Sequence, residues 1–257
     1  MVIYFSGNGN SKAIAVSIAE KLKCKYLALE GKLLITPESN EIECNDKCIT
    51  WVFPVYSWGI PPVVTNFIQK CKIKNAHKCL HHLVVSCGDD TGLIAQQWRK
   101  TISKRGWQSG SATSIVMPNT YVLMKGFDTD SKELETKKLD ECKAAIQHAV
   151  DRIKNDCVDD DMLKGRFAWI KSHIIYPWFI RYAMSAKPFH STEACISCGK
   201  CAKQCPMENI AMVNGHPTWS DKCAMCLRCY HRCPVNAIAY GNSTDSKHQY
   251  QYPDNES

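Results

Sequence analysis

The sequence predicts an α/β fold, a five-stranded doubly wound parallel sheet followed by a small α+β domain. Two observations lead to this prediction. Over residues 1–157, short apolar runs alternate with segments of helical periodicity, as in a parallel sheet covered by helices on both faces. Over residues 190–241, one cysteine pattern occurs twice, which indicates a pseudo-twofold pair of half-units. We expect a helical basic and aromatic connector (158–189) between the two domains and a polar tail (242–257) after them.

Composition is typical of a cytoplasmic globular protein. Hydrophobic residues make up 45% of the 257 residues and charged residues 22%, which suffices for a packed core. The N-terminal residues contain no basic segment ahead of a long apolar one, so no secretory signal is expected. The most apolar later segment, SHIIYPWFI, is far shorter than the ~20 residues that span a bilayer. In a cytoplasmic chain, 16 cysteines point to metal binding rather than to disulfides.

The first strand and the turn after it predict a phosphate-binding loop. The apolar run VIYF (2–5) ends at SGNGNS (6–11), and a helical pattern follows. In this arrangement, free N–H groups and the start of a helix can cradle a phosphate. Further strands are expected at 24–29, 49–55, 81–87 and 112–118, and helices at 61–73, 91–105 and 130–157.

Several ligands compete for this loop. The P-loop pattern is absent, and a dinucleotide fingerprint beginning at Gly7 has Lys12 in place of its third glycine. Its ribose partner could only be Glu30. By itself the segment could also be a glycine-rich turn capped by Asn10 or Ser11.

The loops that follow the third, fourth and fifth strands favour a flavin. PVYSWGIPP (54–62) offers aromatic rings for stacking, SCGDDTG (86–92) offers backbone N–H groups, and PNTYV (118–122) adds a tyrosine. Together with the first loop, where Ser6, Gly9 and Ser11 match and Asn8 replaces a threonine, residues 1–157 resemble a flavodoxin. The resemblance implies FMN, bound by the following residues: Ser6, Gly7, Asn8, Gly9, Asn10, Ser11, Tyr56, Trp58, Gly59, Cys87, Gly88, Asp89 and Tyr121.

The double cysteine run predicts iron–sulfur clusters. CISCGKCAKQCP (195–206) and CAMCLRCYHRCP (223–234) both read C-x2-C-x2-C-x3-C-P, and an isoleucine follows each run at the same distance, Ile210 and Ile238. Zinc is the alternative, but paired CxxC units would satisfy it without a third cysteine or a closing proline.

Residues 190–241 resemble a bacterial two-cluster ferredoxin. The resemblance implies two [4Fe–4S] clusters, each with three ligands from one run and the fourth from the other. One ligand set is then Cys195, Cys198, Cys201 and Cys233, and the other is Cys223, Cys226, Cys229 and Cys205.

The chain as a whole resembles the flavodoxin–ferredoxin fusion proteins of anaerobes. The resemblance implies an electron-transfer flavo-iron–sulfur protein that couples two-electron and one-electron steps, an oxidoreductase if it reduces an acceptor of its own. Two other classes stay open: a ferredoxin-type carrier whose front domain binds no flavin and serves for docking, and a redox sensor. No catalytic arrangement other than a redox one is found in the sequence.

The connector predicts a partner. Phe167, Ile170, Ile174, Trp178 and Tyr182 recur at helical spacing, which predicts a helix that packs the domains together and is bent or broken at Pro177. Residues 162–190 carry five basic residues and no acidic one, so an acidic redox protein is the expected partner. A membrane surface contacted through 165–190 is the alternative. No nucleic-acid recognition module is present in the sequence.

A smaller group of histidine and cysteine residues lies near the start of the fourth expected strand. His77, Cys79, His81 and His82 could bind a metal ion, although exposed histidines at a strand edge are the commoner explanation.

Overall fold

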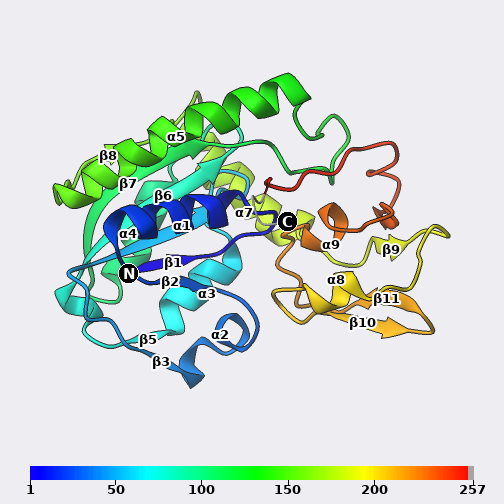
Figure 1. Ribbon diagram of the computed structural model, residues 1–257, viewed down its shortest axis with the longest axis horizontal. Coiled ribbons are helices and arrows are strands. Elements are labelled where there is room, and N and C mark those ends of the chain that lie inside the picture. The colour runs from blue at the N-terminus through cyan, green and yellow to red at the C-terminus, as the bar shows by residue number, and fades with distance from the viewer. Residues whose placement is uncertain (254–257) are drawn as a thin grey trace.

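The computed structural model describes residues 1–253, and its front part is built on one parallel sheet (Figure 1). The sheet has the order β2-β1-β4-β6-β7-β8, and every neighbouring pair of strands is parallel. The strands are β1 (Val2–Tyr4), β2 (Tyr26–Ala28), β4 (Cys48–Pro54), β6 (Leu80–Cys87), β7 (Gln108–Val116) and β8 (Asp160–Asp161). The doubly wound fold is confirmed, with six strands in place of the expected five.

Helices cover both faces of this sheet, and the alternation of side chains along β1 explains why. Val2 and Tyr4 pack toward α1 and α5, whereas Ile3 packs toward α3 and α4 on the opposite face. Two separate apolar cores result, one on each face of the sheet. The helices are α1 (Asn10–Leu22), α3 (Pro62–Lys70), α4 (Ile94–Ser103) and α5 (Lys132–Lys154).

Short elements lie outside the main sheet of the front domain. They are α2 (Lys32–Ile35), 3₁₀ turns at Pro37–Ser39 and Ala76–Lys78, and the parallel pair β3 (Glu41–Ile42) and β5 (Lys72–Ile73). The extra strand β8 pairs with β7 through two aspartates, Asp160 and Asp161, so no apolar run marks it in the sequence.

The connector forms one helical stretch that Pro177 does not break. It comprises α6 (Ala168–Ile170), a π-helical turn (Lys171–Ile175), α7 (Tyr176–Trp178) and a second π-helical turn (Phe179–Ala183). Pro177 lies between the two π-helical turns, whose looser bonding lets the helix continue past a residue without an N–H.

The packing expected of this connector is wrong in one respect. The five apolar residues at helical spacing face outward, with exposed fractions of 44–67%. The inward face consists of Ser172, Tyr176 and Phe179. Ser172 Oγ donates to Trp58 O at 3.0 Å, and Tyr176 Oη donates to Ile60 O at 2.6 Å. Polar contacts therefore attach the connector to the front domain, and its apolar residues remain uncovered.

The cysteine-rich part is a small α+β unit whose backbone repeats at an offset of 28 residues. Left-handed residues occur at Ser197 and Met225, and again at Glu208 and Asn236. Its elements are β9 (Phe189–Ser191) paired with β12 (Ile238–Tyr240), β10 (Ile210–Val213) paired with β11 (His216–Trp219), and two short helices, α8 (Lys200–Lys203) and α9 (Arg228–His231). The structure therefore contains the repeat that the cysteine spacing predicts.

The described part of the polar tail is packed against the protein as far as Tyr252, which the sequence did not predict; residues 254–257 of the tail lie outside the described residues. Figure 1 shows this red segment returning from the cysteine-rich unit to the loop before α1. Tyr250 is 3% exposed, its N–H donates to His231 Nδ1 at 3.0 Å, and its hydroxyl donates to Asn10 Oδ1 at 2.7 Å. Tyr252 N donates to Asn8 O at 3.0 Å.

Candidate functional site

A cavity of about 770 Å³ lies at the carboxyl ends of the parallel strands, between the front domain, the connector and the cysteine-rich unit. This volume is within the roughly 300–1,000 Å³ of small-molecule sites. Eleven of the thirteen residues expected at a flavin line it: Ser6, Gly7, Asn8, Asn10, Ser11, Tyr56, Trp58, Cys87, Gly88, Asp89 and Tyr121. Gly9 and Gly59 are not part of the lining; Gly9 lies against Tyr252, and Gly59 lies against the ring of Tyr176.

The first wall is the loop between β1 and α1. Gly9 has φ 105°, a left-handed conformation that places α1 directly after the loop without a side-chain cap. As at the start of any α-helix, the first N–H groups of α1 have no intrahelical partner. Ser11 Oγ is 2.8 Å from Ser86 Oγ, so a hydroxyl pair joins this wall to the end of β6. Among residues 1–253, the buried Asn8 Oδ1 has no hydrogen-bond partner.

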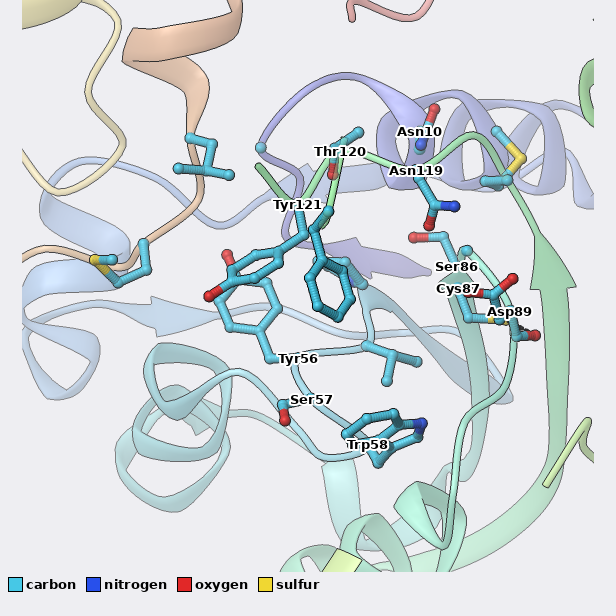
Figure 2. Close-up of a pocket in the computed structure, with 18 of the residues that line it drawn as sticks. Asn10, Tyr56, Ser57, Trp58, Ser86, Cys87, Asp89, Asn119, Thr120 and Tyr121 are labelled. Carbon is cyan, nitrogen blue, oxygen red and sulfur yellow. Dashed lines mark hydrogen bonds between the residues drawn. The ribbon is translucent and has the colours of Figure 1, made fainter. Parts of the chain in front are cut away.

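The second wall is the tight turn after β4. Tyr56 and Gly59 exchange backbone hydrogen bonds of 2.9 and 3.0 Å, and Ser57 and Trp58 both have positive φ. Figure 2 shows Trp58 on this turn, with the rings of Tyr56 and Tyr121 in the same space and Ser86, Cys87 and Asp89 on the facing side. The turn thus presents aromatic surface opposite a polar wall.

The third wall combines the loops after β6 and β7, which a buried ion pair holds together. Lys138 of α5 donates to Asp130 Oδ2 at 2.7 Å and to Gly88 O at 3.0 Å. Asn119 Nδ2 donates to Asp130 Oδ1 at 2.9 Å. Burial alone would raise the pKa of Asp130, but the hydrogen bonds from Lys138 and Asn119 outweigh it and hold that pKa below its usual range.

The third wall also carries a thiol, Cys87, and two carboxylates, Asp89 and Asp90. Burial, then Asp89 and Asp90, raise the pKa of Cys87 to about 12, so this thiol is neutral near pH 7. Asp90 forms an ion pair with Lys171 of the connector, whose ammonium lies 5.0 Å from the Trp58 ring centre. Asp90 is therefore paired, whereas its neighbour Asp89 is exposed.

The eight cysteines of the two runs divide into two neighbourhoods. After burial, the thiols of Cys198 and Cys233 raise the pKa of Cys201. The pKa of Cys229 is raised by burial and then by the thiols of its own predicted set, namely Cys226, Cys223 and Cys205. These neighbours match the two ligand sets that the ferredoxin resemblance implies.

Backbone N–H groups also reach the cysteine sulfurs. Asn209 N donates to Cys205 Sγ at 3.3 Å, and Ala237 N donates to Cys233 Sγ at 3.2 Å. The two bonds are 28 residues apart, so the two halves support their closing cysteines in the same way. Such bonds tune the potential of an iron–sulfur centre.

One cysteine run lies directly against the first wall of the cavity. Cys226 lines the cavity, and a methyl group added at Gly7 would collide with Cys226 O. Arg228 joins the two parts by donating to Ser6 O at 2.7 Å and to Gly7 O at 3.1 Å. The phosphate-type loop and the Cys223–Cys233 segment therefore form one packed interface.

Tyr56 lies between the cavity and the same cysteines. Burial raises its pKa well above the usual value, and the nearby thiols of Cys226 and Cys223 raise it further. Tyr56 is consequently a neutral phenol that touches both parts of the site.

Sequence reasoning missed several residues of this site. The connector contributes Lys171, Ile175, Trp178 and Phe179 to the cavity lining. From the loop after β7, Tyr121 was expected, and the lining residues that were not expected are Met117, Pro118, Asn119, Thr120, Met124, Gly126, Phe127 and Asp128. The helical run of the connector could have indicated a wall, but four of the five residues that gave its strongest signal are absent from the lining, and of those five Trp178 alone belongs to it.

The alternative metal site around His81 has a structural explanation. Both His81 and His82 are fully buried rather than exposed at a strand edge. His81 Nδ1 accepts a bond of 3.0 Å from Trp51 Nε1, and His82 Nδ1 accepts a bond of 3.1 Å from Ser111 N. Within residues 1–253, no three His, Cys, Asp or Glu side chains are grouped so as to hold a single metal ion.

Two family models match the chain. Residues 1–121 match a flavodoxin domain, and residues 194–238 match a 4Fe-4S dicluster domain. The chain therefore combines a flavodoxin domain with a 4Fe–4S domain, as flavodoxin–ferredoxin fusion proteins do. It is a flavin and iron–sulfur electron-transfer protein, and the two matches indicate FMN and iron–sulfur clusters as its cofactors.

Among solved structures, one similar chain is a putative flavoprotein from Bacteroides uniformis, with 14% identity, TM-score 0.34, and coverage of 55% of this chain and 96% of that one. Another is rubredoxin oxygen:oxidoreductase from Desulfovibrio gigas, with 14% identity, TM-score 0.35, and coverage of 60% and 36%. A third is the Trp repressor binding protein from Bacillus subtilis, with 12% identity, TM-score 0.35, and coverage of 58% and 96%. Similarities this low carry no information about function. No curated protein matched the chain.

The groups that line the cavity fit FMN. At one end it offers the start of α1 and the partnerless Asn8 Oδ1, groups that a phosphate and its polar chain can use. Its lining also includes the aromatic rings of Trp58 and Tyr121, surfaces against which a flat ring system can stack. Within residues 1–253, no helix is long and apolar enough to cross a membrane.

Proposed function

We propose that this protein passes electrons between FMN in the cavity and two [4Fe–4S] clusters, and so couples two-electron to one-electron chemistry. FMN exchanges one or two electrons when bound, whereas each cluster exchanges one. The observation that carries the proposal is the position of Cys226, which is both a predicted cluster ligand and part of the wall of the flavin cavity.

Two cluster sites follow from the ligand sets. Cluster site II (Cys223, Cys226, Cys229 and Cys205) lies against the loop before α1, and cluster site I (Cys195, Cys198, Cys201 and Cys233) lies beyond it. In site I, Cys198 is exposed, and Lys200 and Lys203 beside it are exposed as well. An acidic redox protein would dock here, because two exposed basic side chains lie beside the outer cluster site.

The front domain contributes binding and insulation. Residues 6–11 bind the phosphate, Trp58 and Tyr121 hold the rings, and the connector covers the side that Lys171 closes through Asp90. We assign residues 1–157 to the flavodoxin domain, 158–189 to the connector and 190–241 to the ferredoxin domain. The reducing conditions of the cytoplasm suit cysteines that must stay available to iron.

The test is a count of cofactors on protein purified without oxygen. We expect about eight irons, about eight sulfides and about one FMN per chain. Eight irons with no flavin, even after FMN is added back, would contradict the coupling and leave a ferredoxin whose front domain serves for docking. About four irons would contradict the assignment of two clusters. Loss of a cluster in air that creates a new binding activity would favour a sensor.

A further inference from the structure

The connector presents an apolar face that no other part of the described structure covers. Six large side chains on it have exposed fractions of 44–67%: Phe167, Trp169, Ile170, Ile174, Trp178 and Tyr182. Phe167 directly precedes one helical stretch, 168–183, and the other five lie on it; the opposite side of this stretch is attached to the front domain through Ser172 and Tyr176. Contiguous apolar surface of this kind marks a site of contact with another body.

Basic side chains border this face, and Asp90, which lies against Gly165, is paired with Lys171. Lys164 and Arg166 precede the helix, and Arg181 and Lys187 lie at its end; all four are exposed. Residues 162–190 contain no aspartate or glutamate, and within residues 1–253 none of these four cations forms an ion pair. The complementary surface must therefore be both apolar and anionic.

The cations and the rings share the same surface. The Arg166 guanidinium lies 5.7 Å from the centre of the Phe167 ring, and that of Arg181 lies 5.5 Å from the centre of the Tyr182 ring. This arrangement suits the interface of a bilayer, where charged head groups lie directly above the acyl chains and aromatic rings occupy the boundary between them. A helical stretch of this length, about 24 Å, can lie in that plane.

The same surface continues to the mouth of the cavity. Trp178 is exposed and also lines the cavity, and so do Met124 and Phe127 from the loop after β7. Tyr121 lies edge-on between Phe127 and Phe179, which places the loop beside the connector.

We propose that the connector is an interfacial helix that docks the protein on an anionic lipid surface. The proposal is independent of the flavin and the clusters, because it rests on the outward face of the connector alone. Ile170 and Ile174 enter the acyl boundary, while Arg166 and Arg181 meet the lipid phosphates. The cavity mouth then faces the membrane.

The test uses the cofactor-loaded protein and sedimentation with vesicles. We expect binding to phosphatidylcholine vesicles that contain about one third phosphatidylglycerol, weak binding to phosphatidylcholine alone, and weaker binding as salt rises. Because each basic side chain at such a surface contributes a factor of about five, Arg181→Gln with Lys187→Gln should weaken binding about thirtyfold. The matched control, Lys143→Gln with Lys154→Gln on α5, should change it less than about threefold.

The apolar contribution has its own matched pair. Ile170→Ser with Ile174→Ser should weaken binding at least about tenfold, since each change removes three apolar carbons from the boundary and adds a hydroxyl. Leu134→Ser with Val213→Ser, two aliphatic residues exposed elsewhere, should leave it unchanged. None of these residues lines the cavity, so bound flavin and iron should be equal in all variants.

Three results would overturn the proposal. One is the absence of binding to both kinds of vesicle. A second is equal loss of binding in the test and control pairs. A third is self-association in analytical ultracentrifugation that Ile170→Ser with Ile174→Ser abolishes, which would make this face an interface between copies of the chain.

Discussion

The two cysteine runs are nearly identical in sequence pattern and backbone, but their surroundings differ. Cys226 of the second run lies against Gly7 and lines the flavin cavity, whereas its counterpart in the repeat, Cys198, is exposed. Arg228 bonds to the loop before α1, whereas its counterpart, Lys200, is exposed. A repeat alone gives two equivalent redox sites, and a single interface makes one of them inner and the other outer.

This difference sets the order of the redox sites along the molecule. If electrons pass between FMN and cluster site II, site I is the exit or entry for a partner. Substitutions at positions that are equivalent in the repeat can therefore test the comparison, because each inner variant has an outer control.

The largest effect is expected at the ligands. Cys226→Ser should remove about half of the iron and stop the bound flavin from reducing the remaining cluster. Cys198→Ser should also remove about half of the iron, yet flavin and site II should still exchange electrons. Freeze-quenched electron paramagnetic resonance after photoreduction of the flavin measures both. Equal electron transfer in the two variants would show that the inner and outer sites are misassigned.

The next largest effect is expected at the interface. Arg228→Ala leaves the carbonyls of Ser6, Gly7 and Gln204 without a charged donor, so it should lower the free energy of unfolding by about 3 kcal/mol. Lys200→Ala, the matched control, should stay within about 0.5 kcal/mol. Urea unfolding of the loaded protein measures the difference, and similar losses in both variants would mean that the interface is not what Arg228 stabilises.

A smaller effect is expected from one added methyl group. Gly7→Ala places a Cβ against Cys226 O, which should cost about 2 kcal/mol through displacement of the cysteine segment and should slow flavin-to-cluster electron transfer. Gly106→Ala is the control: its left-handed backbone is strained, but a Cβ there has nothing within 4 Å. Transient kinetics should show slowing in Gly7→Ala alone, and a normal rate in that variant would mean that the contact is not on the electron path.

The smallest effect is a pH dependence within the front domain. Burial lowers the pKa of His82 from 6.5 to about 4. The unfolded chain therefore binds more protons between these values, and stability falls as pH decreases from about 6.5 toward 4. Between pH 6.5 and 5 this amounts to between about 1 and 2 kcal/mol.

Variants of two histidines separate the contribution of His82 to the pH dependence of stability from any acid lability of the clusters. His82→Gln should be less stable at pH 7 but lose less on acidification, whereas His77→Gln, at an exposed position, should keep the wild-type slope in urea midpoints measured across this pH range. An unchanged slope in His82→Gln would contradict the assignment.

Much of the fold could be predicted from local pattern. Strand, turn and helix alternate strongly in the front domain, and the loops at the strand ends converge because parallel strands place their carboxyl ends on one edge. That is why eleven residues chosen from four separate loops line one cavity. The cysteine repeat likewise predicted a backbone that repeats at the same offset.

The remaining features depend on contacts between distant segments. Nothing in the local sequence of Lys138 or Asp130 reveals that they would pair under the flavin loops. The spacing of apolar residues in the connector predicts its helix correctly, but periodicity cannot distinguish an apolar face that is buried in the protein from one that is exposed. Tyr250 stands in a polar segment, and only its bonds to His231 and Asn10 show that this segment is packed.

The returning segment around Tyr250 and Tyr252 also determines the order of assembly. A ribosome makes the loop at residues 6–11 first and the residues that lie on it, 250 and 252, roughly 240 positions later. Until then, that side of the loop has no cover, so the folded form of the loop is complete only at this late stage of translation.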